Sequence, residues 1–331
     1  MILAGDIGGT KTNIALIETG GEDAPGALAS ERTYHSATYD SLEAILKEFI
    51  AEQRRPSITH ACFGVAGPVI DGQVQTPNLA WDVSARALGE VLGIERVSLI
   101  NDLEATAHGI EALKPEQLYM LNSGKQRPGG NRALIAAGTG LGMAGIVQHE
   151  GHYRPTPSEG GHIDFAPRGL MEIDLLNYLA EKYGGHVSYE RVISGPGLYD
   201  IYCFLRLHQY APEPDWLAAE IKGGDDAAAV SRAALAGKSE LAVKALDMFV
   251  SIYGAMAGNL ALLMVATGGL YVGGGIAPKI LEKIKDGTFM RAFTDKGRFS
   301  SFNAEIPVHV ILDDKAALYG AARYALLVHH V

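Results

Sequence analysis

The fold is decided by the stretch Leu3-Ala-Gly-Asp-Ile-Gly-Gly-Thr-Lys-Thr-Asn-Ile-Ala-Leu-Ile17. It predicts a short apolar strand, a tight turn through Gly8 and Gly9, and a second strand from Asn13 onward, which together form a β-hairpin. A glycine turn exposes backbone N–H groups, and the missing Cβ atoms let a phosphate chain approach them. Taken alone, the stretch fits an ordinary Gly-Gly hairpin equally well.

Polar side chains beside this turn fit a nucleotide with its cation. Thr10 and Thr12 offer hydroxyls, and Lys11 and Asn13 offer further donors. Asp6 is an anion next to an expected anion site, which makes sense if a cation lies between the two. We therefore expect Asp6 to contact, through water, the Mg²⁺ that accompanies ATP.

The composition argues against a nucleic-acid-binding protein. The chain has 331 residues, enough for two domains that each have a core. Its net charge is −10, and no run of Lys and Arg offers a basic surface. The two cysteines, Cys62 and Cys203, cannot form a disulfide framework or a four-cysteine zinc site, so they favour a reducing cytoplasm.

Neither a signal peptide nor a membrane span is expected. The first apolar run has no basic region before it and reaches Asp6 almost at once. One uncharged stretch, Ala257 to Ile276, has the twenty residues that a membrane span needs. Thr267, Gly268 and Gly269 interrupt it, which favours the end of a buried helix followed by a short strand.

The order of the predicted elements indicates an α/β fold with sheets of mixed direction. After the hairpin we expect strands at 27–35, 60–65 and 97–100, and helices at 41–53, from 84, and at 103–112. A second cycle starts near Leu118, where strands at 133–137 and 143–149 flank the turn Gly138-Thr-Gly-Leu-Gly142. This repeats the N-terminal pattern. Two such turns facing each other across a cleft are suited to hold a triphosphate.

The rest of the chain is predicted to be mostly helical. We expect helices at 170–183, 188–193, 196–209, 227–236, 240–266, 277–285 and 315–328, and strands at 270–272 and 308–312. The closing helix is expected to return to the first domain. This division predicts a small domain of residues 1–112 plus 314–331 and a large domain of residues 113–313.

Asn101 and Asp102 stand where a buried strand meets a helix, a place from which a side chain can point into a crevice. Phosphoryl transfer to an alcohol needs a carboxylate that accepts the hydroxyl proton, and Asp102 is suited to this role. The competing interpretation is that Asp102 only caps the following helix.

Glu159 and His162 flank two glycines, so the backbone there can lie close to a ligand. A carboxylate and an imidazole at this spacing suit the neighbouring hydroxyls of a sugar. Glu159, His162 and Asp164 are a weaker candidate for a metal site, because no second His/Cys cluster completes it. Glu190, taken alone, fits the N-terminal charge of a helix. Gly273-Gly-Gly275 fits either a surface for adenine or ribose or a tight connection from strand to helix.

These motifs, in this order and over essentially the whole chain, resemble the bacterial glucokinase family of the actin-like ATPase and hexokinase superfamily. The three glycine motifs are similar to its two phosphate motifs, Asp6-Ile-Gly-Gly-Thr10 and Gly138-Thr-Gly-Leu-Gly142, and to its adenosine motif, Gly273-Gly-Gly275. Further stretches are similar to those of members that lack zinc: Ile100-Asn-Asp102, Glu159-Gly-Gly-His162, Glu190-Arg-Val-Ile-Ser-Gly-Pro-Gly197 and Asp295-Lys-Gly-Arg-Phe299. The resemblance implies a two-domain, ribonuclease H-like α/β fold with a duplicated mixed sheet and a cleft between the domains.

The resemblance also implies a glucokinase, which phosphorylates the 6-hydroxyl of D-glucose with ATP and Mg²⁺. Asp102 would be the general base, and the other sugar hydroxyls would be bound by Asn78, Asn101, Glu159, His162 and Glu190. The nucleotide would be bound by Asp6, Gly8, Gly9, Thr10, Lys11, Thr12, Asn13, Gly138, Thr139, Gly140, Gly142, Gly273, Gly274 and Gly275.

The resemblance also bears on structural zinc and on oligomeric state. Zinc-containing relatives carry a cysteine-rich loop after the Glu-Gly-Gly-His motif, and this chain has no cysteine there, so we expect no structural zinc. No N-terminal helix-turn-helix is visible, which disfavours the repressor branch. The resemblance implies a cytoplasmic homodimer whose partners are a small sugar and a nucleotide, and neither a membrane nor a nucleic acid.

Three other functions stay open. The first is a kinase for fructose, mannose or an N-acetylated amino sugar, because the sequence does not show the room around the sugar's 2-position. The second is a nucleotide-dependent binding protein of the filament-forming or chaperone kind, which Asn101, Asp102, Glu159 and His162 disfavour, since it needs no sugar site. The third is a sugar-sensing regulator that binds its ligand without turnover. The phosphoryl donor also stays open between ATP, ADP and polyphosphate.

Overall fold

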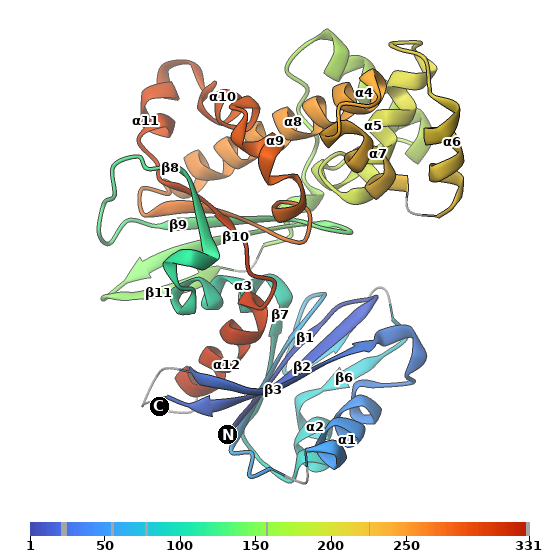
Figure 1. Cartoon of the computed structure of the whole chain (residues 1–331). Coiled ribbons are helices and arrows are strands. Elements are labelled where there is room, and N and C mark those ends of the chain that lie inside the picture. Colours follow the sequence, from blue (N-terminus) through green and yellow to red (C-terminus); the bar gives the residue numbers. More distant parts are fainter. Residues whose placement is uncertain (21–24, 54–55, 77–78, 157, 225, 329–331) are drawn as a thin grey trace. The chain divides into compact units, whose positions relative to one another are not determined.

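The computed structural model describes residues 1–20, 25–53, 56–76, 79–156, 158–224 and 226–328 (Figure 1). The chain divides into two units. Unit 1 comprises Met1–Gln117, Arg154–Pro157 and Asp313–Val331, and unit 2 comprises Leu118–Tyr153 and Ser158–Leu312. A mixed β-sheet lies at the centre of each unit.

The sheet of unit 1 has the strand order β3-β2-β1-β4-β7. Its strands are β1 (Ile2–Ile7), β2 (Lys11–Thr19), β3 (Pro25–His35), β4 (His60–Val65) and β7 (Val97–Asn101). A separate ribbon pairs β5 (Gln73–Gln75) with β6 (Asp82–Ser84). β1 and β2 pair antiparallel, which confirms the predicted hairpin. β1, β4 and β7 run parallel, so their carboxyl ends lie at one edge of the sheet.

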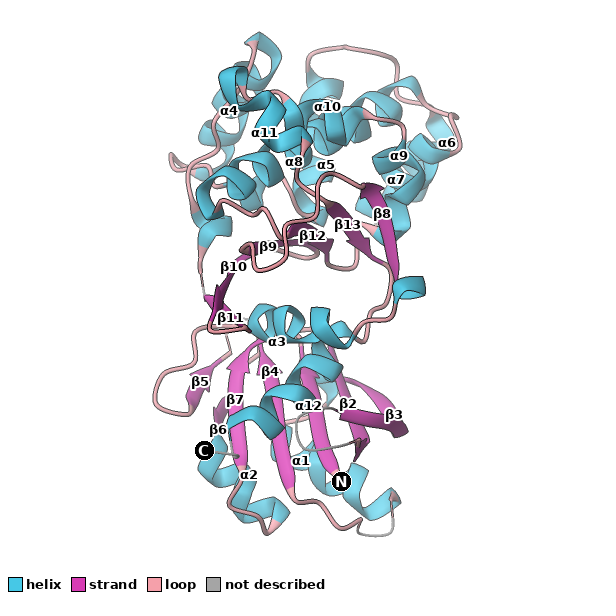
Figure 2. Ribbon diagram, turned by 90° about the vertical axis from the view of Figure 1, so that its left-hand side faces the viewer, coloured by secondary structure: helices cyan, strands magenta, loops and turns pink. Residues whose placement is uncertain are grey.

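Helices cover both faces of this sheet (Figure 2). They are α1 (Leu42–Glu52), α2 (Ala85–Leu92), α3 (Asp102–Gly109) and α12 (Ala316–Val328). Alternation along β1 separates two cores, because successive side chains of a strand point to opposite faces. Leu3 and Ile7 pack in the core that contains α1, whereas Ile2 and Ala4 pack in the core that contains α12.

α3 and α12 touch backbone to backbone through glycines. A Cβ atom at Gly320 would lie 1.7 Å from the carbonyl oxygen of Ala105. A Cβ atom at Gly109 would lie 2.0 Å from the carbonyl oxygen of Ala316. Since α3 begins at Asp102, this contact holds the helix that presents Asp102 against the rest of unit 1.

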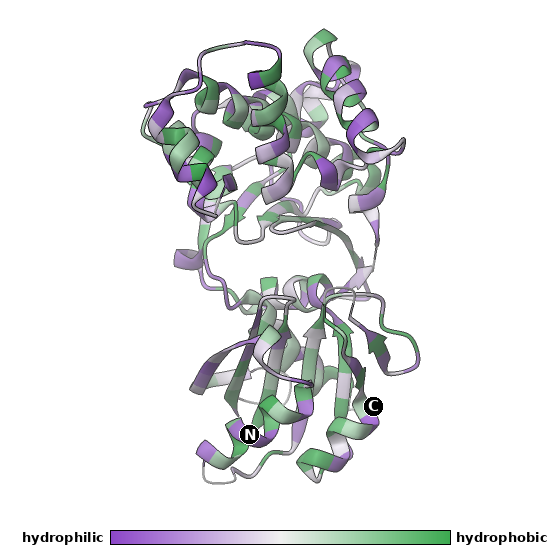
Figure 3. Ribbon diagram, turned by 90° about the vertical axis from the view of Figure 1, so that its right-hand side faces the viewer, coloured by the Kyte–Doolittle hydropathy of each residue, from purple (hydrophilic) through white to green (hydrophobic). Residues whose placement is uncertain are grey.

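The sheet of unit 2 has the strand order β11-β10-β9-β12-β13-β8. Its strands are β8 (Leu118–Asn122), β9 (Arg132–Ala137), β10 (Leu141–His149), β11 (His152–Thr156), β12 (Gly269–Gly273) and β13 (Val308–Ile311). The helices are α4 (Leu170–Tyr183), α5 (Gly195–Leu207), α6 (Asp215–Lys222), α7 (Asp226–Leu235), α8 (Glu240–Met264), α9 (Leu281–Lys285), α10 (Thr288–Thr294) and α11 (Ser300–Ala304). Figure 3 shows the central strands coloured mainly as hydrophobic, in keeping with their burial.

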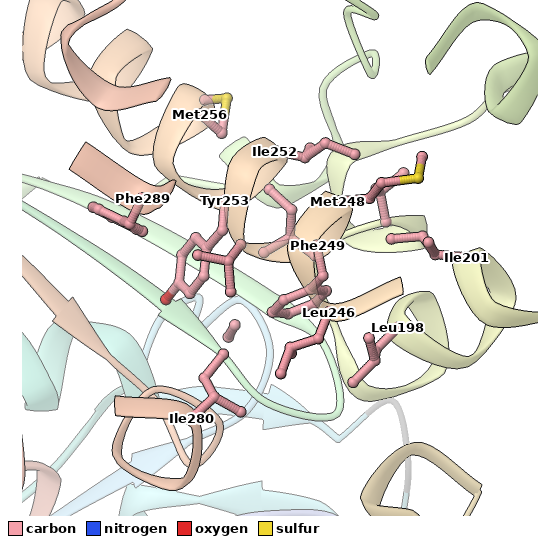
Figure 4. Packing of buried hydrophobic residues seen from close by; sticks show 14 of the residues in the cluster. Leu198, Ile201, Leu246, Met248, Phe249, Ile252, Tyr253, Met256, Ile280 and Phe289 are labelled. Carbon is pink, nitrogen blue, oxygen red and sulfur yellow. The ribbon is translucent and has the colours of Figure 1, made fainter. Parts of the chain in front are cut away.

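The core of unit 2 is organised around α8 (Figure 4). Tyr253 of this helix packs edge-on against Phe249 and Phe289. Its hydroxyl lies 3.3 Å from the carbonyl oxygen of Ile135 on β9 and 3.4 Å from that of Gly273 on β12. Tyr253 thus ties the helix layer to the two strands that end at glycine turns.

Among the described residues, α8 is the one helix whose length and composition fit a membrane span, and 72% of its apolar window is buried inside the structure. The helix ends at Met264, and β12 starts at Gly269. This confirms the prediction that the uncharged stretch is a buried helix end followed by a strand.

The prediction of a helix over 188–193 is wrong. Tyr189–Arg191 forms only a short 3-10 turn, and α5 begins at Gly195. The reason is the cap: the Ser194 side chain accepts a hydrogen bond from the N–H of Gly197, which starts a new helix there. β6, β11, α6, α10 and α11 are also absent from the prediction, because each is short and has little periodicity of its own.

Replacing Gly320 by alanine should destabilise the protein by about 2 kcal/mol or more, because the new methyl group meets backbone atoms that cannot turn aside. Gly169→Ala is the matched control, since a Cβ atom there meets nothing within 4 Å. Urea denaturation measures both variants. Equal midpoints for Gly320→Ala and the wild type would contradict the close packing of α3 and α12.

Candidate active site

Polar residues gather at the edge of unit 1 where the parallel strands end. Asp6 lies near the end of β1, Asn101 ends β7, and Asp102 begins α3. Gly64 on β4 pairs with Asp6, and a Cβ atom at this glycine would lie 2.8 Å from the Ala105 side chain. The missing side chain at Gly64 therefore lets the first turn of α3 lie close to the strand.

The cap of α3 is Asn101. Its Oδ1 accepts hydrogen bonds from the N–H groups of Leu103 at 2.9 Å and Glu104 at 3.4 Å, and its Nδ2 donates to Gly67 O at 3.2 Å. Asp102 is the first residue of the helix, and its Oδ1 also accepts from Leu103 N at 2.8 Å. The N-cap of α3 is therefore Asn101 and not Asp102, in contrast to the interpretation that Asp102 only caps the helix.

Asp6 is part of a concentration of negative charge. Burial, together with the charge of Asp102, raises the pKa of Asp6 from 3.8 to about 6, and Asp314 adds to the rise. Asn13 opposes the rise by donating from Nδ2 to Asp6 Oδ2 at 3.5 Å, while its Oδ1 accepts from the Thr33 hydroxyl at 2.8 Å. Sequence reasoning missed Asp314, whose only local signal is its place just before the closing helix.

A divalent cation fits this edge through water and phosphate rather than through a protein cage. Within the described ranges, no three His, Cys, Asp or Glu side chains are grouped closely enough to hold a metal ion. Mg²⁺ keeps several waters and often takes one or two carboxylates together with substrate phosphates. Burial and the charge of Asp102 raise the pKa of Asp6, so a nearby cation would favour its ionised form.

The first glycine turn is supported from inside the protein. Gly8 N donates to Lys11 O at 2.9 Å and closes the turn. The buried Ser36 hydroxyl donates to Gly8 O at 2.8 Å and shares a 3.0 Å hydrogen bond with the buried Thr12 hydroxyl. Thr12 therefore supports the turn from below, whereas Thr10 and Lys11 are exposed. Sequence reasoning missed Ser36, because nothing in the local pattern connects it with a turn so far away in the chain.

The other two glycine motifs meet in unit 2. β9 and β10 form an antiparallel hairpin around Gly138–Gly142, and Gly138 N donates to Gly140 O at 2.8 Å. A Cβ atom at Gly274 would lie 2.3 Å from Ala137 O, and Ile276 N donates to the same oxygen at 3.2 Å. The Gly273–Gly275 motif therefore lies directly against the base of the Gly138–Gly142 turn.

Unit 2 also brings the predicted sugar residues to this turn. A Cβ atom at Gly161 would lie 1.9 Å from Leu141 O, so the segment with Glu159 and His162 runs along the start of β10. Tyr189 N donates to Ile163 O at 3.0 Å, which places Glu190 next to that segment. The Glu159 and His162 side chains are exposed, with Oε2 and Nε2 3.9 Å apart.

One predicted residue stands apart from this arrangement, and another is not described. Asp164, the third member of the weak metal candidate, is exposed and pairs with His186 at 3.0 Å. Asn78 lies outside the described residues. Each unit thus presents one cluster: Asp6, the first glycine turn, Asn101 and Asp102 in unit 1, and the other two glycine motifs with Glu159, His162 and Glu190 in unit 2.

Comparisons with known proteins point to one family. The family model "Glucokinase" matches residues 3–328. The chain is 46% identical to the glucokinase of Synechocystis sp. (97% of this chain, 96% of the relative) and 42% identical to that of Nostoc punctiforme (97% and 98%). It also superposes on the crystal structure of a glucokinase from an Antarctic psychrotroph with a TM-score of 0.83 and 31% identity, over 98% of both chains. The superposition confirms the predicted fold class.

Asp6→Asn should change how stability depends on pH. The folded wild type holds the Asp6 proton up to about pH 6, whereas the carboxyl in the unfolded chain loses it near 3.8. The free energy of unfolding of the wild type therefore falls as the pH rises through this window. Between pH 4 and pH 7 the variant should gain about 2 to 3 kcal/mol relative to the wild type.

Urea denaturation without nucleotide or Mg²⁺ at both pH values measures this difference. Asp40→Asn is the control. Its carboxylate is exposed, so removing it should leave the pH dependence of the unfolding free energy close to that of the wild type. Parallel pH profiles for Asp6→Asn and the wild type would contradict a burial cost at Asp6.

Proposed function

The chain belongs to the glucokinase family, and we propose that it transfers the γ-phosphoryl group of ATP to the 6-hydroxyl of D-glucose. Family membership makes it a hexose kinase. One observation carries the assignment of roles: Asp102 begins a helix at the carboxyl ends of three parallel strands, close enough to Asp6 to raise the pKa of that carboxyl.

In the proposed reaction Asp102 accepts the proton of the 6-hydroxyl as its oxygen attacks the γ-phosphorus. Such a base accelerates the reaction about 10²–10⁴-fold. Positioning of the reactants and neutralisation of the phosphate charge supply most of the remaining acceleration. Asn101 holds the start of α3 and retains one amide N–H for a sugar hydroxyl. Glu159 and His162 supply an acceptor and a donor for neighbouring hydroxyls.

The nucleotide is proposed to bind the exposed backbone of the glycine turns, with Thr10 and Lys11 as further donors. Bound Mg²⁺ would neutralise phosphate charge near Asp6. We propose that the two units are the two domains of the enzyme and that sugar binding brings them together, because water is otherwise a competing acceptor.

The proposal extends to the enzyme's location, its assembly and its metabolic role. The two cysteines, too few for a disulfide framework, support a cytoplasmic protein. The family resemblance supports a homodimer, and the product, glucose 6-phosphate, supports a role in glycolysis.

Asp102→Asn should lower kcat by about 10²–10⁴-fold, because the amide cannot accept the proton but can still accept the hydrogen bond from Leu103 N. The Kd for glucose, measured by calorimetry, should change much less. Glu104→Gln, on the same helical turn, is the control and should keep wild-type turnover. Unchanged kcat in Asp102→Asn would remove Asp102 from the chemistry.

Initial rates of phosphorylation, measured with different sugars, test which sugar is the substrate. Glucose with ATP should give a far higher rate than N-acetylmannosamine, fructose or mannose, and ATP without sugar should give almost none, because closure requires the sugar. A higher rate with an N-acetylated sugar would reassign the substrate. Sugar-independent ATP hydrolysis at the glucose-stimulated rate would instead favour a nucleotide-driven binding protein.

A further inference from the structure

The second phosphate turn is held by a carboxylate. Glu190 Oε2 accepts a hydrogen bond from the N–H of Leu141 at 3.0 Å. A Cβ atom at Gly140 would lie 2.5 Å from the same oxygen, so the carboxylate would have to shift if this residue were not glycine. Both residues belong to unit 2, and the contact joins the tip of the β9–β10 hairpin to the turn before α5.

The segment that carries Glu190 is attached to the turn a second time. Gly195 N donates to Gly138 O at 2.9 Å, on the other side of the turn. The buried Ser194 hydroxyl donates to Glu190 O at 2.7 Å and accepts from Gly197 N at 3.1 Å. The segment 190–195 is therefore a short, internally bonded brace with one contact on each side of the phosphate turn.

We infer that Glu190 is a positioning residue for the phosphate turn. This inference rests on the proposed function, in which Glu190 also binds the sugar. A carboxylate has two oxygens, so Oε2 can hold Leu141 N while the other oxygen accepts a sugar hydroxyl.

Electrostatics predict in which direction nucleotide affinity changes when Glu190 is replaced. A carboxylate near a phosphate site repels the phosphate, so removing a carboxylate with no structural role would strengthen nucleotide binding. Removing a carboxylate that holds the turn leaves the Leu141 N–H without its acceptor and loosens the donors that face the phosphate. The two roles of Glu190 therefore predict opposite changes in nucleotide affinity.

Calorimetry of the full chain with Mg²⁺ and the β,γ-imido analogue of ATP, in the absence of sugar, measures this change. Glu190→Ala should weaken binding about tenfold, the loss expected for one charge-assisted hydrogen bond. Glu190→Gln should bind the analogue at least as tightly as the wild type, because its amide oxygen can accept the same bond from Leu141 and the repelling charge is gone. His162→Ala is the matched control: its ring is exposed and outside the brace, so glucose affinity should fall while sugar-free analogue binding does not change.

Analogue binding by Glu190→Ala that equals or exceeds the wild type would overturn the inference and leave Glu190 as a sugar ligand alone. If the alanine variant does not fold, Glu190→Asp gives the same test, since it keeps the charge but is one methylene too short to reach Leu141 N. Failure of the proposed function is a separate outcome, because it shows as a wild type that does not phosphorylate glucose.

Discussion

Close approach of one backbone to another is the constraint on which both clusters of polar residues depend. In unit 1, the missing side chain of Gly64 lets the first turn of α3 lie close to β4. The missing side chain of Gly320 lets α12 lie close to the backbone of α3. In unit 2, Gly161 and Gly274 bring two further segments against the second glycine hairpin. A side chain at any of these positions would push apart elements that carry candidate ligands. The glycines therefore fix where the candidate ligands lie.

The charged side chains of unit 1 are arranged at a cost to the unliganded protein. Asp6, Asp102 and Asp314 lie near enough to one another for their charges to raise the pKa of Asp6. Such an arrangement places like charges close together, which costs free energy. The protein compensates in part with Asn13, which donates to Asp6 and is itself held by Thr33. Asn13 thus keeps the Asp6 carboxylate oriented.

Helix caps stabilise the two junctions near which candidate carboxylates stand. Asn101 satisfies the first N–H groups of α3, so the adjacent Asp102 is not required as the cap. Ser194 caps α5 and at the same time bonds the carbonyl of Glu190. In both places one residue stabilises the helix start, and a carboxylate beside it is presented from a rigid junction. Rigid presentation is what a reaction governed by positioning requires.

The sequence by itself determined the features that depend on neighbours along the chain. The hairpin at Gly8 and Gly9, the strands at 60–65 and 133–137, the junction at Asn101 and the buried end of α8 all follow from local periodicity and from glycine. Only the tertiary structure decided the contacts between distant segments: Ser36 beneath the first turn, Asp314 near Asp6, and Glu190 on Leu141. The physical reason is that a hydrogen bond or a charge interaction depends on distance in space, and a local pattern does not record which remote segment the fold brings near.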